Sequence, residues 1–276
     1  MHLLLQIPTI ISAVLKEKKF IANLVVKESI SGIISDNRFG VYSSKIPSVY
    51  ITHQLNVLSG NSTWLTSKIH QKILKKFNEI WVPDVISKYS LSGELSNIQS
   101  KRIHIKRIGV LSRFNSKEIQ KKQDVLLLLS GVEPQRTLFE NMLVKEFSNF
   151  KGNVLLVRGV LNKTEIKVPS NFTVINYLLV TELEKAIQQS NLVIARSGYS
   201  TIMDLAVLNV NVLFVPTPKQ YEQEYLAEHL NKKYKIPFLN QKDFKLESIN
   251  NFNKKGKFKS FKTTLPLNLF NLFQGK

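Results

Sequence analysis

One stretch, residues 191–230, constrains the fold more than any other part of the chain. Two short apolar runs, 191–195 and 210–215, are each followed by a turn and then by a segment whose apolar residues recur with helical spacing. Strand, turn and helix repeated in this order are typical of a parallel sheet, because parallel strands need a crossover connection between them. The sequence therefore predicts an α/β protein.

The turns of this unit carry the candidate ligand-binding groups. Parallel strands end at one edge of the sheet, and ligands bind beyond that edge. The turn Arg196–Thr201 offers Ser200 or Thr201 as a helix cap, and free N–H groups at a helix start favour an anion such as phosphate. Asp204 lies one turn into the helix, and Gln223–Glu224 lie in the second loop. Their oxygens are placed to accept hydrogen bonds from sugar hydroxyls.

The same stretch resembles the donor-binding half of family 28 glycosyltransferases. That family includes the N-acetylglucosaminyltransferase that completes the peptidoglycan lipid precursor. Its pattern is roughly (S)RxGxxT(I/V)xE, an apolar strand, a Val-Pro turn and a Gln-rich acidic patch. The residues that match are Arg196, Gly198, Thr201, Asp204 (in place of the usual Glu), Val215–Pro216 and Gln223–Glu224.

The resemblance implies a fold and a reaction. The fold is two Rossmann-like parallel-sheet domains of the GT-B type. The reaction transfers a hexose or N-acetylhexosamine from a UDP-sugar to an acceptor hydroxyl, with inversion and without a metal ion. Asp204 is expected to hold the ribose, Gln223 and Glu224 to contact the sugar, and residues 176–178 to lie near the base. The residues expected at the diphosphate are Ser130, Gly131, Arg136, Gly198 and Ser200.

The phosphate loop departs from the family. Members of the family have a GGSxG-type loop here, whereas this chain keeps only Ser130 and Gly131. Arg136, six residues after Ser130, is expected to supply positive charge that the loop lacks.

A polar segment, Ser112–Gln123, is predicted to link two domains, residues 1–115 and 116–276, the second with a basic C-terminal tail. The first half shows only some four strands, the fourth predicted at 107–111. The family's glycine loop after its first strand is not found. The first domain is therefore expected to be incomplete, without the N-terminal part of the acceptor domain. A fragment or late start codon, a separately encoded segment and a degenerate protein are the alternatives, and the first is favoured.

A histidine at the end of a predicted strand is the candidate catalytic residue of the first half. Strand 48–52 runs into His53-Gln54-Leu55-Asn56, which is similar to the family's HExxN motif with Gln54 in place of Glu. The resemblance places His53 on the acceptor side. A loop histidine satisfied by its own hydrogen bonds is the alternative.

Charge and composition limit the partners. The formal net charge is +19, from 39 basic and 20 acidic residues, and residues 254–262 hold five lysines and two phenylalanines. Such a charge favours an anionic partner, whether nucleic acid, an anionic membrane or a phosphorylated substrate, unless it reflects a Lys- and Asn-rich proteome. No nucleic-acid-binding motif is found, so nucleic acid is not expected as a partner.

Metal and cofactor chemistry is also not expected. There is no cysteine, the five histidines are scattered, and no DxD pair is found. The GxGxxG, GxxxxGK[ST] and GxSxG motifs are likewise not found. No cofactor is predicted besides the UDP-sugar donor.

The apolar start of the chain, residues 1–15, lacks the basic n-region of a signal peptide and is too short to span a bilayer. It is interpreted as a core or interfacial helix. The protein is expected in the cytoplasm, where a lipid-linked or membrane-associated acceptor would place it at the inner face of the membrane. A noncatalytic donor-binding or partner subunit of a split glycosyltransferase, and a nucleotide-sugar 2-epimerase, are the other hypotheses.

Overall fold

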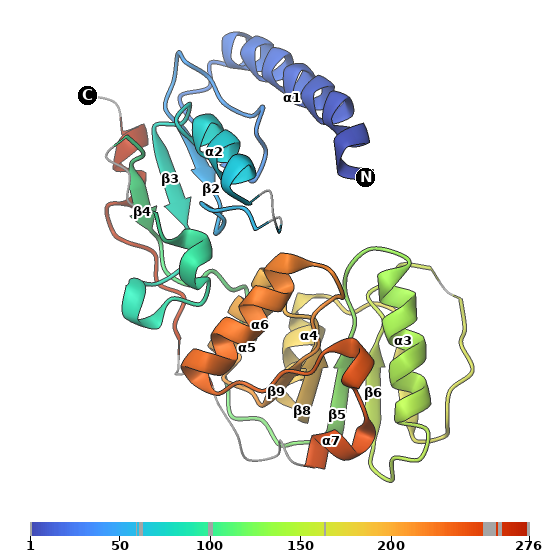
Figure 1. Cartoon of the computed structure of the whole chain (residues 1–276). Helices are drawn as coiled ribbons and strands as arrows, with labels where there is room; N and C mark the ends of the chain where they lie inside the picture. The colour runs from blue at the N-terminus through green and yellow to red at the C-terminus, as the bar shows by residue number, and fades with distance from the viewer. Residues whose placement is uncertain are drawn as a thin grey trace. The chain divides into compact units, whose positions relative to one another are not determined.

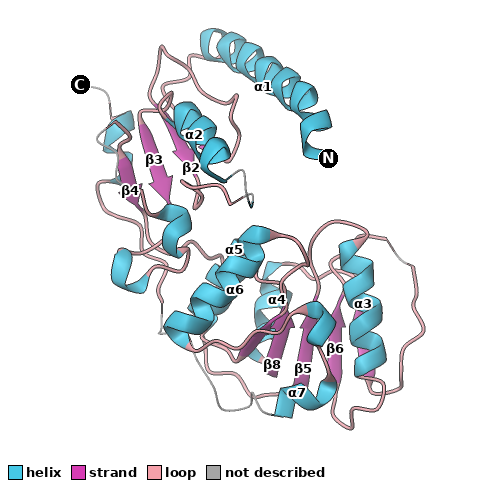
Figure 2. Ribbon diagram, viewed as in Figure 1, coloured by secondary structure: helices cyan, strands magenta, loops and turns pink. Residues whose placement is uncertain are grey.

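The computed structural model describes residues 2–58, 60, 63–98, 102–162, 164–250, 258 and 261–274. The chain divides into two compact units, shown in Figure 1. Unit 1 is Met1–Gly109 together with Thr264–Lys276, and unit 2 is Val110–Thr263. Both units combine parallel strands with helices (Figure 2), so the predicted α/β class with two parallel sheets is confirmed.

The strands are β1 (Ile33–Asp36), β2 (Ser48–Ile51), β3 (Glu79–Val82), β4 (Ile105–Arg107), β5 (Gln123–Leu128), β6 (Val154–Val157), β7 (Phe172–Ile175), β8 (Ser190–Ala195) and β9 (Val212–Phe214). The helices are α1 (His2–Lys27), α2 (Thr63–Leu74), α3 (Gln135–Glu146), α4 (Val180–Gln188), α5 (Tyr199–Leu208), α6 (Tyr221–Tyr234) and α7 (Leu246–Asn250). Short 3-10 turns are η2 (Ser87–Tyr89), η3 (Gly93–Ser96), η4 (Gln241–Asp243) and η5 (Leu269–Phe273).

Unit 1 contains a parallel sheet in the order β1-β2-β3-β4. On one face, Tyr50 and Ile80 from the strands pack with Leu74 and Phe77 at the end of α2. On the other face, Trp81 contacts two rings of η5, Phe270 and Phe273. Four predicted strands are thus present.

Unit 2 contains a parallel sheet in the order β7-β6-β5-β8-β9. The chain starts at the centre with β5, moves outward to β6 and β7, and then returns to the other side of β5 for β8 and β9. This reversal creates a topological switch point at the carboxyl ends of β5 and β8, where open α/β sheets bind their ligands.

Burial on both faces explains the continuous apolar runs of unit 2. Val125, Leu127 and Leu129 belong to one buried cluster, together with Phe139 of α3. Leu126, which lies between Val125 and Leu127 in the sequence, is fully buried as well. Successive side chains of a strand point to opposite faces, so neither face of β5 meets water.

Three sequence predictions differ from the structure. The fourth strand was expected at 107–111 but ends at Arg107. The C-terminal residues 264–276, predicted to lie in the second domain, belong to unit 1 because Phe270 and Phe273 pack on Trp81. The segment predicted as a linker lies in unit 2, which starts at Val110 and not at residue 116.

A buried charge network fixes the ends of α3 and β6. Glu140, with 3% of its surface exposed, accepts hydrogen bonds from Arg136 Nη1 at 2.9 Å and from Arg158 Nε at 2.7 Å. Arg158 also donates to Thr164 O and Asn176 Oδ1, at 2.6 and 2.9 Å, and so holds the loops that follow β6 and β7. The carboxylate of Glu140 therefore bridges two buried guanidinium groups.

Replacing Glu140 with alanine is expected to lower the free energy of unfolding by about 3–5 kcal/mol, because breaking a buried pair leaves uncompensated buried charge. Urea denaturation followed by circular dichroism measures the change. The control is Glu228→Ala, which removes an exposed carboxylate of α6 and should change stability little. Equal stability of the two variants would contradict a structural role for the network.

Candidate functional site

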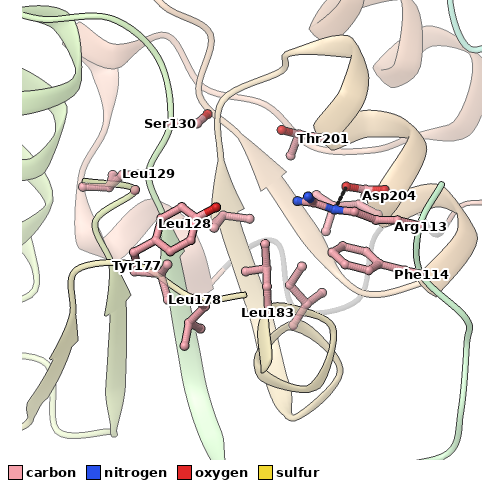
Figure 3. Close-up of a pocket in the computed structure, with 14 residues that line it drawn as sticks. Arg113, Phe114, Leu128, Leu129, Ser130, Tyr177, Leu178, Leu183, Thr201 and Asp204 are labelled. Atoms are coloured by element: carbon pink, nitrogen blue, oxygen red, sulfur yellow. Dashed lines mark ion pairs between the residues drawn. The ribbon is translucent and has the colours of Figure 1, made fainter. Parts of the chain in front are cut away.

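A cavity of about 210 Å³ lies in unit 2 at the switch point. Its walls come from the segments that follow β5, β6 and β7, from the first turns of α5, from α4 and from the start of unit 2. The residues that line it are Arg113, Phe114, Leu128, Leu129, Ser130, Val157, Gly159, Tyr177, Leu178, Leu183, Ile187, Thr201, Asp204 and Leu205. Figure 3 shows Asp204 and Arg113 on one side of this pocket and Tyr177 on the other.

Asp204 is the carboxylate of the pocket, as its position in the sequence motif led us to expect. Ser112 Oγ donates a hydrogen bond to Asp204 Oδ1 at 2.6 Å, and Arg113 Nε lies 4.0 Å from Asp204 Oδ2. Burial raises the pKa of Asp204 above its ordinary value, and the Ser112 hydrogen bond and the Arg113 charge offset part of this rise. A carboxylate held in this way is an acceptor for hydroxyl groups in the pocket.

Helix α5 starts beside the pocket without a side-chain cap. Its N-cap is Gly198, and neither Ser200 nor Thr201 caps it, so that part of the prediction was wrong. Thr201 lines the pocket, whereas Ser200 is exposed and does not. The uncapped first turn keeps its backbone N–H groups available to an anion.

The segment after β5 contributes Ser130 to the pocket wall, whereas Gly131 lies next to it outside the lining. Gly131 has φ +106°, which only glycine adopts readily, although a Cβ there would meet no atom within 4 Å. Backbone conformation, and not crowding, therefore requires glycine at this turn.

Residues 110–122, here called the strap, are the part of the site that the sequence pattern missed. Phe114 is buried with 1% of its surface exposed, and its N–H donates to Ser112 Oγ. The strap is then fixed to α4, since Asn115 N–H donates to Glu184 Oε2 at 2.8 Å and Lys117 N–H to Gln188 Oε1 at 2.6 Å.

The polar composition of the strap led to its prediction as a linker, although one aromatic residue within it, Phe114, was a signal of packing. The spacing of Thr181 and Glu184 in the sequence predicts a capping box at the start of α4, and the contacts of the strap show that this pair does not form it. Glu184 bonds the strap, and it is Glu182 that accepts a hydrogen bond from the backbone N–H of Leu179 at the helix start.

Of residues 176–178, which the resemblance places near the base, two lie in the pocket wall, and their contact with a base remains a prediction. Tyr177 and Leu178 line the pocket, and the ring of Tyr177 is half exposed. Asn176 instead accepts a hydrogen bond from Arg158, which fixes the loop that carries the two lining residues.

Two predicted arginines lie in the framework and do not line the pocket. Arg196 donates to the carbonyls of Val215 and Pro216, at 3.0 and 2.9 Å, and its guanidinium lies 3.8 Å from the ring centre of Phe139. Burial lowers the pKa of Arg196 to about 10. Arg136 is neutralised by Glu133 and Glu140, so the charge expected from it at the phosphate loop is already balanced.

Gln223 and Glu224 shape the loop before α6. Gln223 Oε1 accepts a hydrogen bond from Thr217 N–H, and Glu224 Oε1 accepts one from Lys219 N–H, both at 2.9 Å. The backbone carbonyl of Gln223 accepts a further bond from Ser197 Oγ at 2.8 Å. Neither residue lines the 210 Å³ cavity, so their contact with a sugar remains a prediction.

In unit 1, His53 lies just after the carboxyl end of β2 and is partly buried. Asn56, the other residue of the HExxN-like motif, binds the following turn through hydrogen bonds from its Nδ2 to Glu94 O and Asn97 O, at 2.8 and 3.0 Å. The side-chain amide of Asn56 therefore stabilises this turn of unit 1.

The family model "Glycosyltransferase family 28 C-terminal domain" matches residues 125–262, half of the chain. These residues include most of the pocket wall. The chain belongs to the family 28 glycosyltransferases.

One curated relative of this family 28 chain is the UDP-N-acetylglucosamine–N-acetylmuramyl-(pentapeptide) pyrophosphoryl-undecaprenol N-acetylglucosamine transferase of Buchnera aphidicola subsp. Schizaphis graminum. It is 24% identical over 251 residues, which are 87% of this chain and 66% of the relative. The chain therefore spans less than two thirds of the length of this relative.

Solved structures show the same fold. The glycotransferase of kitacinnamycin matches with a TM-score of 0.62 and 13% identity, over 91% of this chain and 74% of that chain. MurG from Acinetobacter baumannii matches with a TM-score of 0.52 and 15% identity, over 88% and 67%. These likenesses establish the GT-B fold that the sequence motifs predicted.

The described residues offer neither a metal site nor a membrane span. They contain no group of three or more His, Cys, Asp or Glu side chains placed to hold a metal ion. Among the helices of the same residues, none is long and apolar enough to cross a bilayer. The basic tail at 254–262 lies largely outside the described residues, which there include only residues 258, 261 and 262.

Asp204→Asn is expected to leave unit 2 at least as stable as the wild type at neutral pH. Because the pKa of Asp204 is raised on folding, its ionised form costs stability above that pKa. The difference between variant and wild type should therefore shrink as the pH falls through the folded-state pKa. Thermal denaturation at neutral and acidic pH measures it.

Ser112→Ala is the matched comparison for this variant. It removes the donor that stabilises the carboxylate, so it should lower stability at neutral pH. A clear loss of stability in Asp204→Asn would mean that the carboxylate holds the fold together and is not strained by burial.

Proposed function

We propose that the chain is a glycosyltransferase that binds a UDP-sugar in the pocket of unit 2 and transfers the hexose or N-acetylhexosamine to an acceptor hydroxyl. The observation that carries the proposal is the placement of Asp204. This partly buried carboxylate lines a pocket at the switch point of a family 28 domain, one turn into an uncapped helix.

Each wall of the pocket fits one part of the donor. Asp204 accepts hydrogen bonds from the two ribose hydroxyls. The N-terminus of α5 and the guanidinium of Arg113 supply positive potential to the diphosphate. The apolar side of the pocket, with Leu128 and Leu178 beside the ring of Tyr177, takes the flat uracil base.

The reaction exchanges one bond to the sugar C1 for another. The acceptor oxygen attacks C1 from the face opposite the diphosphate, the bond from C1 to the diphosphate oxygen breaks, and the electron pair leaves with UDP. A proton acceptor removes the hydroxyl proton of the acceptor. Fixed dipoles and Arg113 stabilise the departing diphosphate in the metal-independent mechanism that we propose.

The acceptor is proposed to be lipid-linked. The name of the curated Buchnera relative specifies an undecaprenol-linked acceptor, and the +19 net charge suits work at an anionic membrane surface. Unit 1 supplies the acceptor side, with His53 at the end of β2 as the predicted contact.

Calorimetric titration of the full chain tests the donor site. We expect UDP and UDP-N-acetylglucosamine or UDP-glucose to bind and GDP to bind at least about tenfold more weakly, a difference of about 1.4 kcal/mol. Asp204→Asn should weaken UDP binding by a similar factor or more, because the amide accepts poorly from two hydroxyls.

Glu228→Gln is the control for this titration, since it removes one carboxylate from an exposed position on α6. It should bind UDP like the wild type. If the folded wild-type chain binds no uridine nucleotide, or if Asp204→Asn binds as tightly as the control, the donor assignment is wrong.

Donor affinity is also expected to depend on pH. The ionised carboxylate of Asp204 binds the ribose, and its pKa is raised. Affinity should therefore fall on acidification at a higher pH than an ordinary aspartate would allow. UDP-N-acetylglucosamine is the suitable ligand, because its doubly esterified diphosphate does not titrate in that range. The Asp204→Asn variant should bind weakly at every pH, and an unchanged wild-type slope in this variant would exclude Asp204 as the titrating group.

A further inference from the structure

The side chain of Asp204 does not by itself fix the plane of its carboxylate. The torsion that sets this plane joins an sp3 carbon to an sp2 carbon, and such torsions have broad, roughly two-fold minima. With 18% of the side-chain surface exposed, water contributes little to holding the two oxygens in place. A site that binds hydroxyl groups through these oxygens therefore needs neighbouring protein groups to orient them.

The strap faces this carboxylate with a hydroxyl and a guanidinium. Ser112 Oγ donates to Oδ1 of Asp204 at 2.6 Å, whereas Arg113 Nε lies 4.0 Å from Oδ2, beyond hydrogen-bond distance. Figure 3 shows Arg113 and Phe114 of the strap beside Asp204. Ser112 is thus the strap side chain that makes the short and directional contact, and the guanidinium of Arg113 acts through its charge.

A second contact determines where the hydroxyl proton of Ser112 points. Ser112 Oγ accepts a hydrogen bond from Phe114 N–H at 3.1 Å. A hydroxyl group has one proton and two lone pairs, so the oxygen accepts from Phe114 and gives its own proton to Asp204. An ionised carboxylate has roughly four acceptor positions, of which Ser112 uses one. The others remain for the two hydroxyls of a ribose.

Ser112 is itself held in place from both sides. On one side Phe114 is buried with 1% of its surface exposed, and Asn115 N–H donates to Glu184 of α4 at 2.8 Å. On the other side Thr263 Oγ1 donates to the backbone carbonyl of Ser112 at 3.4 Å. A residue fixed in this way imposes a defined position on the group that it contacts.

We propose that Ser112 is a positioning residue of the donor site, whose hydroxyl holds the Asp204 carboxylate in the orientation that receives the ribose hydroxyls of the nucleotide. Ser112 does not line the pocket, so it acts through Asp204 and does not touch the donor. The inference rests on the proposed UDP-sugar site. It gives the strap, whose polar composition predicted a linker, a place in the recognition of the donor.

Such a role makes the effect of Ser112 depend on the hydroxyl groups of the ligand. UDP carries both ribose hydroxyls, whereas 2′,3′-dideoxy-UDP lacks both and keeps the base and the diphosphate. A general disturbance of the strap would weaken the two ligands alike, because the strap also contributes Arg113 and Phe114 to the pocket wall. A loss of affinity that is restricted to UDP therefore identifies an effect on the group that binds the hydroxyls.

Calorimetric titration of the full chain with UDP and with 2′,3′-dideoxy-UDP at neutral pH tests this role. We expect the wild type to prefer UDP. Ser112→Ala should weaken UDP binding about tenfold, as expected for the loss of one hydrogen bond to a charged group, and leave the affinity for the dideoxy ligand unchanged. Ser112→Thr keeps a hydroxyl and should restore most of the affinity for UDP.

Ser170→Ala is the matched control for these variants. Ser170 is an exposed serine of unit 2 that lies just before β7, at the edge of the sheet opposite the pocket. It should bind both ligands like the wild type. Circular dichroism of every variant verifies that the compared proteins are folded.

The pH dependence of UDP-N-acetylglucosamine binding is a second readout. The Ser112 hydrogen bond favours the ionised carboxylate and lowers the pKa of Asp204, against the rise that burial causes. In Ser112→Ala this pKa should rise further, so the affinity should begin to fall at a higher pH than in the wild type. The other titratable side chains of the pocket wall are Arg113 and Tyr177, and both are present in the two proteins. A lower affinity with an unshifted pH profile would overturn the positioning role.

A double-mutant cycle shows whether Ser112 acts through Asp204. The double variant Ser112→Ala/Asp204→Asn should bind UDP as Asp204→Asn alone does, because the carboxylate that Ser112 orients is no longer present. A further loss of affinity in the double variant would mean that Ser112 acts on another group, and the inference would be wrong.

The remaining outcomes separate this inference from the proposed function. Equal affinity of Ser112→Ala and the wild type for UDP would exclude a positioning role, and an equal loss for UDP and the dideoxy ligand would reduce Ser112 to a structural residue of the strap. A wild-type chain that binds the two ligands equally tightly would refute the ribose contact of Asp204 and this inference with it. A folded chain that binds no uridine nucleotide would refute the proposed function itself.

Discussion

The site of unit 2 depends on the central place of β5 in its sheet. Because the chain moves from β5 first to one side and then to the other, the segments after β5 and β8 diverge and leave space between them at the carboxyl edge. Ser130 and Asp204 reach that space from the two sides of the switch. The same strand is buried on both faces, so its position cannot shift without disturbing the core.

The cationic groups near this edge fall into two classes. The first class is buried: Arg136, Arg158 and Arg196. Arg136 and Arg158 donate hydrogen bonds to Glu140, and Arg158 donates also to oxygens of the loops that follow β6 and β7. Arg196 donates to the carbonyls after β9. Arg113, with about half of its side chain exposed, faces the pocket instead. The net charge of the chain is +19, but among these arginines only Arg113 lines the pocket. The three buried arginines stabilise the fold and do not line the pocket.

The sequence was sufficient for the fold class and for the place of Asp204 at the end of the sheet, and insufficient for contacts between distant segments. Periodicity located β8 closely and predicted the helix that follows its turn, since local pattern decides both. Asp204 was found because its motif is local. The hydrogen bonds of the strap to α4 and the ring contact of Phe270 with Trp81 join residues far apart in sequence. Local periodicity does not show which distant segments such residues contact.

Local motifs also cannot show whether a candidate site residue is available to a ligand. A motif says which residue type is present, but not which partners consume its hydrogen-bonding capacity. Arg136 and Gln223 look like ligand-binding groups in the sequence, and the structure shows their polar atoms bonded to Glu140 and to the backbone of Thr217.

The hydrogen bond from Ser112 to Asp204 joins the first residues of unit 2 to the pocket wall. Binding of a ligand to Asp204 is therefore coupled to the conformation of the segment through which the chain leaves unit 1. A change in the conformation of that segment would in turn change the affinity of the carboxylate for the ligand. Such linkage is reciprocal by thermodynamic necessity. The strap thus connects the pocket to the rest of the polypeptide, and binding of a ligand in the pocket should change the protection of the strap from proteolysis and from hydrogen exchange.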